Sequence, residues 1–146
     1  MLDKEFYATL DYDFSVYEED EALYGLTPIG FSNNYKPLDL REFDTLNLNA
    51  ARDILSCYLS QTRAFNKRIT SYGLKHIIEN ALAVESGRQI DYISNGTLIL
   101  AMYDYGFKIK RINIDSPNCY FNVSTKSVND IIRYINLHRD SKTMYI

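Results

Sequence analysis

Apolar and polar side chains alternate along the start of the chain. The apolar positions are Phe6, Ala8, Leu10, Tyr12, Phe14 and Val16. Because successive side chains of a strand point to opposite faces, this period of two predicts a strand with one apolar face. The other face carries acids and tyrosines, and the acidic run Glu18–Glu21 predicts a polar turn. A return strand over residues 23–31 would complete an acidic β-hairpin.

Four later segments have apolar residues at the three- and four-residue spacing of a helix. They predict helices over about residues 47–62, 72–86, 95–105 and 125–138. The second is the clearest, with an apolar stripe formed by Leu74, Ile77, Ile78, Ala81 and Leu82. The predicted N-caps are Asn47 or Asn49, Ser71, and Ser94 or Asn95.

Two shorter alternating runs, residues 107–114 and 119–123, predict a second hairpin that turns at Ser116–Asn118. A chain of 146 residues has the length of one domain. We therefore expect a single α+β domain over residues 1–146. In it, an acidic β-hairpin extension (1–45) precedes a mixed α/β body (46–146) with three central helices, a C-terminal β-hairpin and a last helix.

Composition excludes several classes of protein. No apolar run reaches the roughly 18 residues of a membrane span, and residues 1–10 lack the apolar core of a signal peptide. Cys57 and Cys119 form no CxxC motif, and they lie far in sequence from both histidines. We expect reduced thiols in an intracellular protein, with no metal and no cofactor.

Charge is divided unevenly along the chain. Residues 1–45 hold eleven acids against three bases, a charge of −8, whereas residues 46–146 hold eight acids against thirteen bases, a charge of +5. The net charge of −3 therefore combines an acidic extension with a basic body. These two surfaces and one helix face supply three candidate sites.

The first candidate is the acidic face of the predicted N-terminal strand. Its proposed partner-binding residues are Tyr7, Asp11, Asp13, Tyr17, Glu18, Glu19, Asp20 and Glu21. On a strand, alternate carboxylates lie roughly 6.6–6.8 Å apart, close to the ~7 Å that spans two phosphate steps along one nucleic-acid strand. Such a face can imitate nucleic acid and occupy a basic cleft. The alternative is a solubilising strand that protects a sheet edge.

The second candidate is the polar face of the second helix, which carries Tyr72, Lys75, His76 and Glu79 at spacings of three and four. In a metal-independent ribonuclease, His76 would be the general acid or base and Glu79 its partner. Lys75 and Arg63 would then bind the phosphate. The alternative, which we favour, is an ordinary ion pair between Lys75 and Glu79 on a solvated face.

The third candidate is the basic body. Its cations are Arg63, Lys67, Arg68, Arg88, Lys108, Lys110 and Arg111. Together with Phe107 and Tyr120 they can bind single-stranded nucleic acid, or they can simply balance the acidic extension. We interpret Asn95, Asn118 and Asn122, which lie beside turn residues, as caps and turn formers.

Four stretches carry a resemblance to a known group of proteins. They are Ser71–Glu79, Tyr92–Gly96, Ala101–Gly106 and Pro117–Asn122. Across residues 63–123 the pattern resembles a small domain in phage and mobile-element proteins of Gram-positive bacteria, some of which are anti-CRISPR proteins. The resemblance implies a location in the cytoplasm of the bacterial host and a type II RNA-guided nuclease as partner.

The leading hypothesis is a non-enzymatic inhibitor whose acidic, tyrosine-bearing surface blocks the nucleic-acid-binding cleft of that nuclease. Two alternatives remain: a metal-independent ribonuclease acting on guide RNA, and a small regulator that binds guide RNA or DNA through the basic body.

Overall fold

The computed structural model describes residues 2–144, with side chains up to residue 138. Its helices and strands are α1 (Lys4–Ala8), β1 (Leu26–Thr27), β2 (Gly30–Phe31), α2 (Thr45–Tyr58), β3 (Gln61–Asn66), α3 (Ser71–Glu85), α4 (Asn95–Asp104), β4 (Ile109–Arg111), β5 (Cys119–Val123) and α5 (Thr125–Met144). Short 3-10 turns lie at Ser15–Tyr17, Glu21–Leu23 and Leu40–Glu42. The predicted α+β class is confirmed, and the predicted layout of hairpins and helices broadly matches the structure. No helix within residues 2–144 is both long and apolar enough to cross a membrane.

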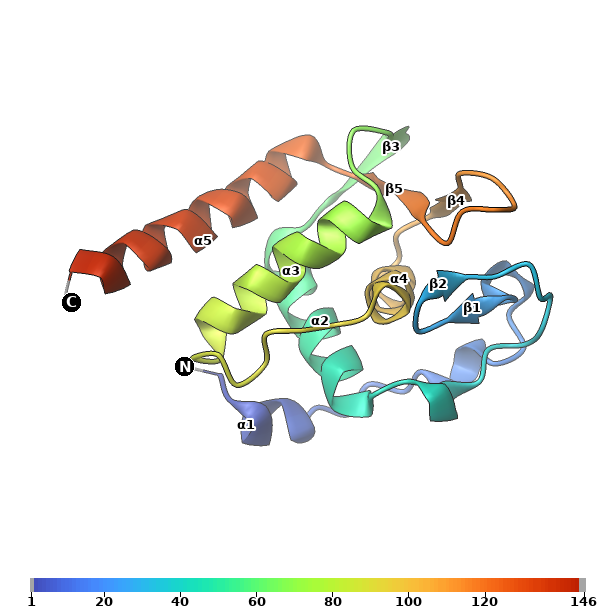
Figure 1. Cartoon of the computed structure of the whole chain (residues 1–146), viewed down its shortest axis with the longest axis horizontal. Helices are drawn as coiled ribbons and strands as arrows, with labels where there is room; N and C mark the ends of the chain where they lie inside the picture. The colour runs from blue at the N-terminus through green and yellow to red at the C-terminus, as the bar shows by residue number, and fades with distance from the viewer. Residues whose placement is uncertain (1, 145–146) are drawn as a thin grey trace.

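The helix α4 lies at the centre of the fold. Eight of its ten residues, Asn95 to Met102, are buried. Helices α2 and α3 and the strand β2 all pack against it, and Figure 1 shows α4 end-on between them. Ser94 caps the helix by accepting a hydrogen bond from the N–H of Thr97. Because α4 is covered on every side, it presents no polar face to solvent.

Three antiparallel strands form the larger sheet, in the order β3-β5-β4. Cys119, Phe121 and Val123 of β5 are buried. Tyr120 of the same strand lies opposite Lys110 of β4. The sequence pattern does not predict the strand β3, because residues 61–66 lack an alternation of apolar and polar side chains. β3 is exposed and polar because it lies at the edge of the sheet, where a strand forms hydrogen bonds to a neighbouring strand on one side only.

The strand predicted over residues 6–16 is wrong. Asp3 accepts a hydrogen bond from the N–H of Phe6 and starts the helix α1, in which Tyr7 is buried. Phe14 is buried as well, although the alternation had placed it on the face opposite Tyr7. The hairpin within residues 1–45 has only the short strands β1 and β2, so residues 6–16 have no strand beside them to pair with.

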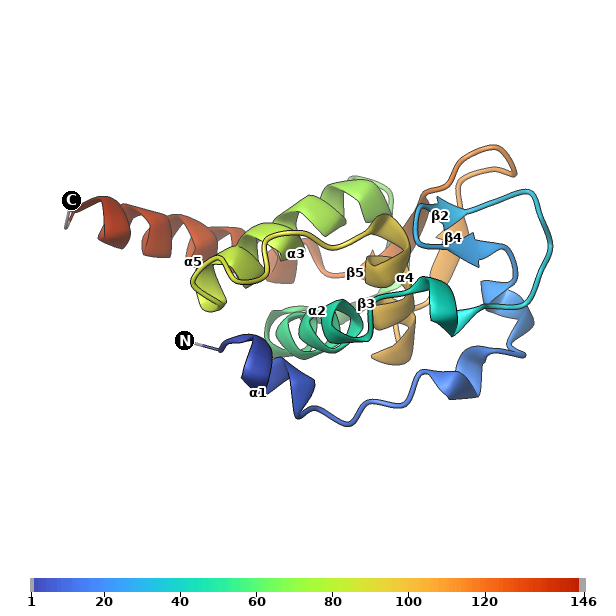
Figure 2. The same cartoon turned by 60° about the horizontal axis from the view of Figure 1, so that its bottom comes forward.

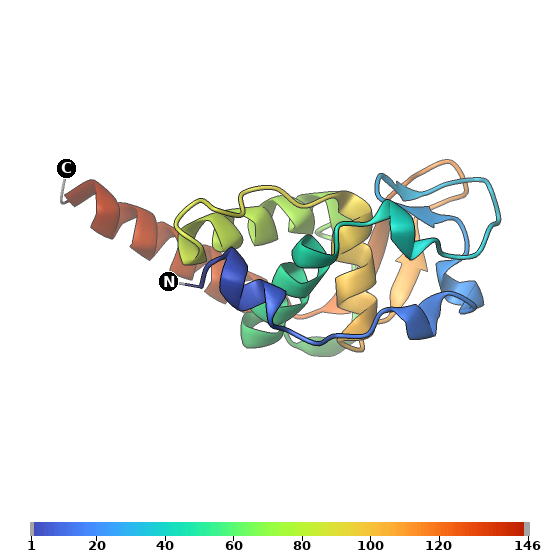
Figure 3. The same ribbon diagram turned by 90° about the horizontal axis from the view of Figure 1, so that it is seen from below.

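The N-terminal segment instead runs along the body, as Figures 2 and 3 show. Arg52 of α2 holds this segment against the body through contacts with Tyr12 and Asp104. Its Nε lies 2.7 Å from Asp104 Oδ2, and its guanidinium lies 4.8 Å from the centre of the Tyr12 ring. The hydroxyl of Tyr17 donates to Asp104 Oδ1 at 2.6 Å. Residues from both 1–45 and 46–146 therefore enter one hydrophobic core.

The predicted helices differ from the observed ones mainly at their ends. Asp44, not Asn47 or Asn49, caps α2, and Thr70, not Ser71, caps α3. The hydroxyl of Ser71 instead accepts a hydrogen bond from the N–H of Cys119 and joins α3 to β5. Aspartate, asparagine, serine and threonine are all favourable N-cap residues, so the sequence contains several candidate N-caps close to the start of each helix.

Gly96 allows the β1–β2 turn to close over the start of α4. Its N–H donates to the carbonyl of Pro28 at 2.8 Å, and a Cβ would lie 1.9 Å from the carbonyl oxygen of Thr27. Because backbone atoms cannot move aside cheaply, we expect Gly96→Ala to lower the free energy of unfolding by about 3 kcal/mol. Urea denaturation followed by circular dichroism measures this loss.

The matched control is Gly73→Ala in α3, where the added Cβ would meet the side chain of Ile69 at 3.2 Å. Alanine is the better helix former, so we expect a net change within about 1 kcal/mol. Equal denaturation midpoints for Gly96→Ala and the unmodified protein would contradict this account of the turn.

Candidate functional site

The polar face of α3 contains a buried ion pair. Lys75 Nζ lies 2.9 Å from Glu79 Oε1, and the two residues are 7% and 8% exposed. His76 Nδ1 lies 3.1 Å from the same oxygen, while its side chain is about half exposed. The predicted pairing of Lys75 with Glu79 is confirmed, but the pair is enclosed by protein and does not lie on a solvated face.

Two tyrosines enclose the ammonium group of Lys75. It lies 4.7 Å from the centre of the Tyr92 ring and 5.6 Å from that of Tyr72. With Glu79 on one side and these rings on others, the charge of Lys75 is neutralised within the protein. It is therefore poorly placed to bind a phosphate.

An open pocket of about 480 Å³ adjoins this pair. Its lining includes Ile29, Tyr72, Lys75, Tyr92, Asn95 and Asn118. Three of the four stretches that carry the family resemblance thus meet here, at α3, at the start of α4 and just before β5. The rings of Tyr72 and Tyr92 remain about half exposed at this site.

Asn95 holds the segments around this pocket together. Its amide Nδ2 lies within 3.1 Å of the carbonyl oxygen of Ile29 and 3.0 Å of Asn118 Oδ1. The predicted cap was Asn95 or Ser94, and the structure assigns that role to Ser94. Asn95 instead links the β1–β2 turn to the β4–β5 connection, a long-range contact that no local pattern reveals.

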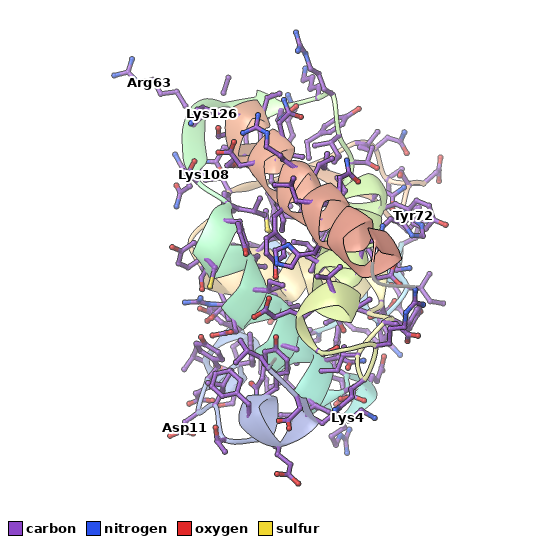
Figure 4. All side chains as sticks on the ribbon, turned by 90° about the vertical axis from the view of Figure 1, so that its left-hand side faces the viewer. Lys4, Asp11, Arg63, Tyr72, Lys108 and Lys126 are labelled. Atoms are coloured by element: carbon purple, nitrogen blue, oxygen red, sulfur yellow. The ribbon has the colours of Figure 1, made fainter. Side chains whose placement is uncertain are left out.

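Arg63 lies apart from the other predicted catalytic residues. Figure 4 shows it projecting from β3, on a different side of the molecule from Tyr72, the first residue of the α3 group. The candidate ribonuclease set of Arg63, Lys75, His76 and Glu79 is therefore not assembled. Of its three members on α3, His76 is exposed whereas Lys75 and Glu79 are buried. We do not propose nuclease activity for this face.

The acidic segment, residues 11–21, keeps most of its predicted groups accessible. The exposed carboxylates are those of Asp11, Asp13, Glu18, Glu19 and Glu21. Hydrogen bonds from the hydroxyl and backbone N–H of Ser15 lower the pKa of Asp13, which stabilises its charged form. Because these residues lie in irregular segments, a turn and a 3-10 turn and not on a strand, the regular spacing expected of a phosphate mimic is absent.

Three predicted members of the acidic face have structural roles instead. Tyr7 is completely buried, so it cannot contact a partner; the prediction that it lies on the acidic face is wrong. Asp20 is half-buried and accepts a hydrogen bond from the Tyr103 hydroxyl at 2.7 Å. That bond, together with burial, raises the pKa of Tyr103 to about 12. Tyr17 is half-buried and donates to Asp104.

The larger sheet carries a strong excess of positive charge. Residues 59–71, 105–114 and 119–129, which contain its strands, hold seven bases and no acid. Six of these bases are exposed, and we call them the basic sheet surface: Arg63, Lys67, Arg68, Lys108, Lys110 and Lys126. The seventh, Arg111 of β4, is half-buried and lies over the Phe31 ring. Among the residues whose side chains are described, Lys126 is the one member of this surface with an ion-pair partner, since its Nζ lies 3.7 Å from Asp130 Oδ2.

Two predicted members of the basic body lie outside this surface. Arg88 follows the C-terminal end of α3, whereas the N-terminal end of that helix joins β5. Phe107 is buried, at 1% exposure, and packs in the core. Two other aromatic residues of the sheet, Phe65 and Tyr120, are half-buried.

The acidic segment and the basic sheet surface do not neutralise each other. Within residues 2–138, no ion pair joins residues 1–45 to the body. Figure 4 shows Arg63 and Lys126 at the top of the molecule and Asp11 at the bottom. The alternative that the basic body balances the acidic extension by direct contact is therefore not supported.

Asn122 of β5 holds the basic sheet surface in shape. Its side chain is buried between the outer strands, where Oδ1 accepts a hydrogen bond from the N–H of Lys108 at 2.8 Å. Its Nδ2 donates to the carbonyl of Thr62 at 3.1 Å. The interpretation of Asn122 as a turn former is wrong, because it lies within a strand and bridges both neighbours.

Comparison with protein-family models, curated proteins and solved structures found no match for this chain. Within the described residues, no three His, Cys, Asp or Glu side chains gather in a way that could hold a metal ion. The functional assignment therefore depends on charge, burial and geometry.

The buried ion pair of α3 makes a direct prediction about stability. Lys75→Met leaves the Glu79 carboxylate enclosed without its ammonium partner, so we expect a loss of about 3 kcal/mol in the free energy of unfolding. Replacing both residues by methionine removes the uncompensated charge and should recover most of that loss. His76→Ala, at a half-exposed position, should cost less than about 1 kcal/mol.

Urea denaturation of these three variants and the unmodified protein measures the differences. Equal losses for the single and the double methionine variants would show that the ion pair does not account for the effect.

Proposed function

We propose that this protein binds nucleic acid through its basic sheet surface. The observation that carries the proposal is the set of six exposed cations on and beside three adjacent strands, without one carboxylate in the same segments. A surface of this kind binds phosphates, and release of the counterions around the nucleic acid drives the association.

The position of the charge adds to this argument. A protein whose acids and bases alternate over its surface has little field at a distance, but here the acidic segment lies away from the sheet. The field of the sheet can therefore attract a polyanion, while the acidic segment repels it from the other side. This orients the molecule on the nucleic acid.

The buried α4 restricts how nucleic acid can be bound. In helix-turn-helix proteins, the second of two crossing helices enters the major groove. Here α3 and α4 are consecutive and cross, as Figure 1 shows, but α4 is enclosed by α2, α3 and β2. Because α4 cannot reach base edges, α3 and α4 cannot bind nucleic acid as a helix-turn-helix.

Neutralising part of the basic sheet surface tests the proposal. We expect Arg63→Gln/Lys67→Gln/Lys110→Gln to weaken binding of a fluorescent oligonucleotide at low salt. The slope of log affinity against log salt concentration should become shallower by about 2, since each lost phosphate contact removes about 0.7 for a single strand. Fluorescence anisotropy titrations at several salt concentrations measure both quantities.

The chain supplies a matched control with the same change in net charge. Lys4→Gln/Lys36→Gln/Arg41→Gln removes three exposed bases within residues 1–45. It should leave affinity and salt slope close to those of the unmodified protein. If the two triple variants behave alike, binding depends on net charge and not on the sheet, and the proposal fails.

A second candidate function is favoured by the acidic segment. Its five exposed carboxylates have no ion-pair partner among residues 2–138, and the segment is held against the body by buried Tyr7 and Phe14. We propose, as this second candidate, that it contacts a basic cleft of a type II RNA-guided nuclease and thereby inhibits it. Complementary charge would speed the encounter of the two proteins.

Inhibition assays on a purified nuclease of this type test the second candidate. We expect Asp11→Asn/Asp13→Asn/Glu18→Gln/Glu19→Gln/Glu21→Gln to abolish inhibition at physiological salt while the fold is retained. Asp20 is left unchanged because it bonds to Tyr103, and Asn at position 13 keeps an acceptor for Ser15. The control neutralises Asp91, Asp115 and Asp130 of the body. Undiminished inhibition by the fivefold variant would disprove the role of the segment.

A further inference from the structure

A groove opens along one edge of the basic sheet surface. It has a volume of about 380 Å³, and its lining includes Phe65, Lys67, Arg68, Val123 and Thr125. An aromatic ring, two exposed cations and the first residue of α5 thus meet in one depression. Most of its lining, including Phe65 and both cations, comes from β3 and the residues that follow that strand.

An irregularity in the sheet creates this groove. Gln61 pairs with Val123 and Asn66 pairs with Phe121, so four residues of β3 lie opposite the single residue Asn122 of β5. The extra residues must leave the plane of the sheet, as in a large β-bulge. Bulges of this kind redirect side chains, and here the bulge includes Arg63, which projects outward in Figure 4.

Asn66 fixes the far end of the bulge. Its Nδ2 donates to the carbonyl of Val123 and to the hydroxyl of Thr125, each at 3.1 Å. Its Oδ1 accepts from the N–H of Arg68 at 3.0 Å and so shapes the turn that carries the two cations. The groove is therefore built by specific bonds, and a ligand would find it already formed.

Phe65 supplies a surface on which a planar group can stack. Its ring is half-buried, and Lys110 Nζ lies 5.9 Å from the ring centre, near the outer limit of a cation–π contact. No carboxylate lines the groove. An aromatic surface beside unpaired cations is the combination that binds a base together with its phosphate.

We propose that this groove holds one nucleotide of a single-stranded nucleic acid, with its base stacked on Phe65 and its phosphate beside Lys67 and Arg68. The inference rests on the proposed binding of nucleic acid by the sheet, and it specifies that the nucleic acid is single-stranded. A duplex cannot use the site, because its bases are stacked on their neighbours and only its backbone is accessible.

The test compares Phe65→Leu, which removes the ring but keeps an apolar side chain, with Tyr35→Leu, which removes an exposed aromatic ring outside the sheet. The probes are fluorescent single strands of about 12 nucleotides, as RNA and as DNA, and the corresponding DNA duplex. We expect Phe65→Leu to weaken single-strand binding about tenfold, with an unchanged salt slope because no charge is lost. Duplex binding by this variant and all binding by Tyr35→Leu should be unchanged.

Two further variants keep the inference testable if Phe65→Leu fails to fold. Phe65→Tyr retains the ring and should retain single-strand affinity, and Lys67→Gln/Arg68→Gln should weaken binding with a shallower salt slope. If Phe65→Leu binds single strands as well as the unmodified protein, the groove is not a stacking site, while the sheet remains the nucleic-acid surface. Equal weakening on duplex and single strand also overturns the stacking role. If the unmodified protein binds none of the probes, the proposed function itself is wrong.

Discussion

The burial of α4 on every side is the constraint on which the rest of the structure depends. A helix with eight of ten residues in the core must be enclosed by other elements, and α2, α3, β2 and the β1–β2 turn do this. Residues 1–45 are therefore part of the core and not an appended hairpin. The same burial removes α4 from contact with solvent, so any macromolecular partner must be bound by the surfaces around it.

The acidic and basic surfaces lie on different sides of the molecule. Arg52 and Asp104 hold the acidic segment against α2 and α4, on the side away from β3. The basic sheet surface is left with cations that no carboxylate of the acidic segment reaches. One molecule thus presents a basic side and an acidic side. The two candidate functions use different sides, so they can be tested separately and do not exclude each other.

The sequence predicted the regular parts of the fold well. The helices α2, α3 and α5 followed from spacing because each has one face in the core and one in water, and α4 and the strands near residues 107–123 followed from the spacing of their apolar residues alone. The N-terminal strand failed because alternation is evidence of a strand only where another strand can pair with it. In the site, the Lys75–Glu79 pair followed from helical spacing, but its enclosure by Tyr72 and Tyr92 required contacts between distant segments.

What the sequence determined by itself was the class of the fold, the helices and the unequal division of charge, since these depend on composition and local periodicity. Only the tertiary structure decided which side chains remain accessible. It buried Tyr7, separated Arg63 from His76, gave Asn95 and Asn122 their bridging roles, and formed the groove beside Phe65. The physical reason is the same in each case: burial and long-range hydrogen bonds depend on which segments pack together, and no local pattern encodes that choice.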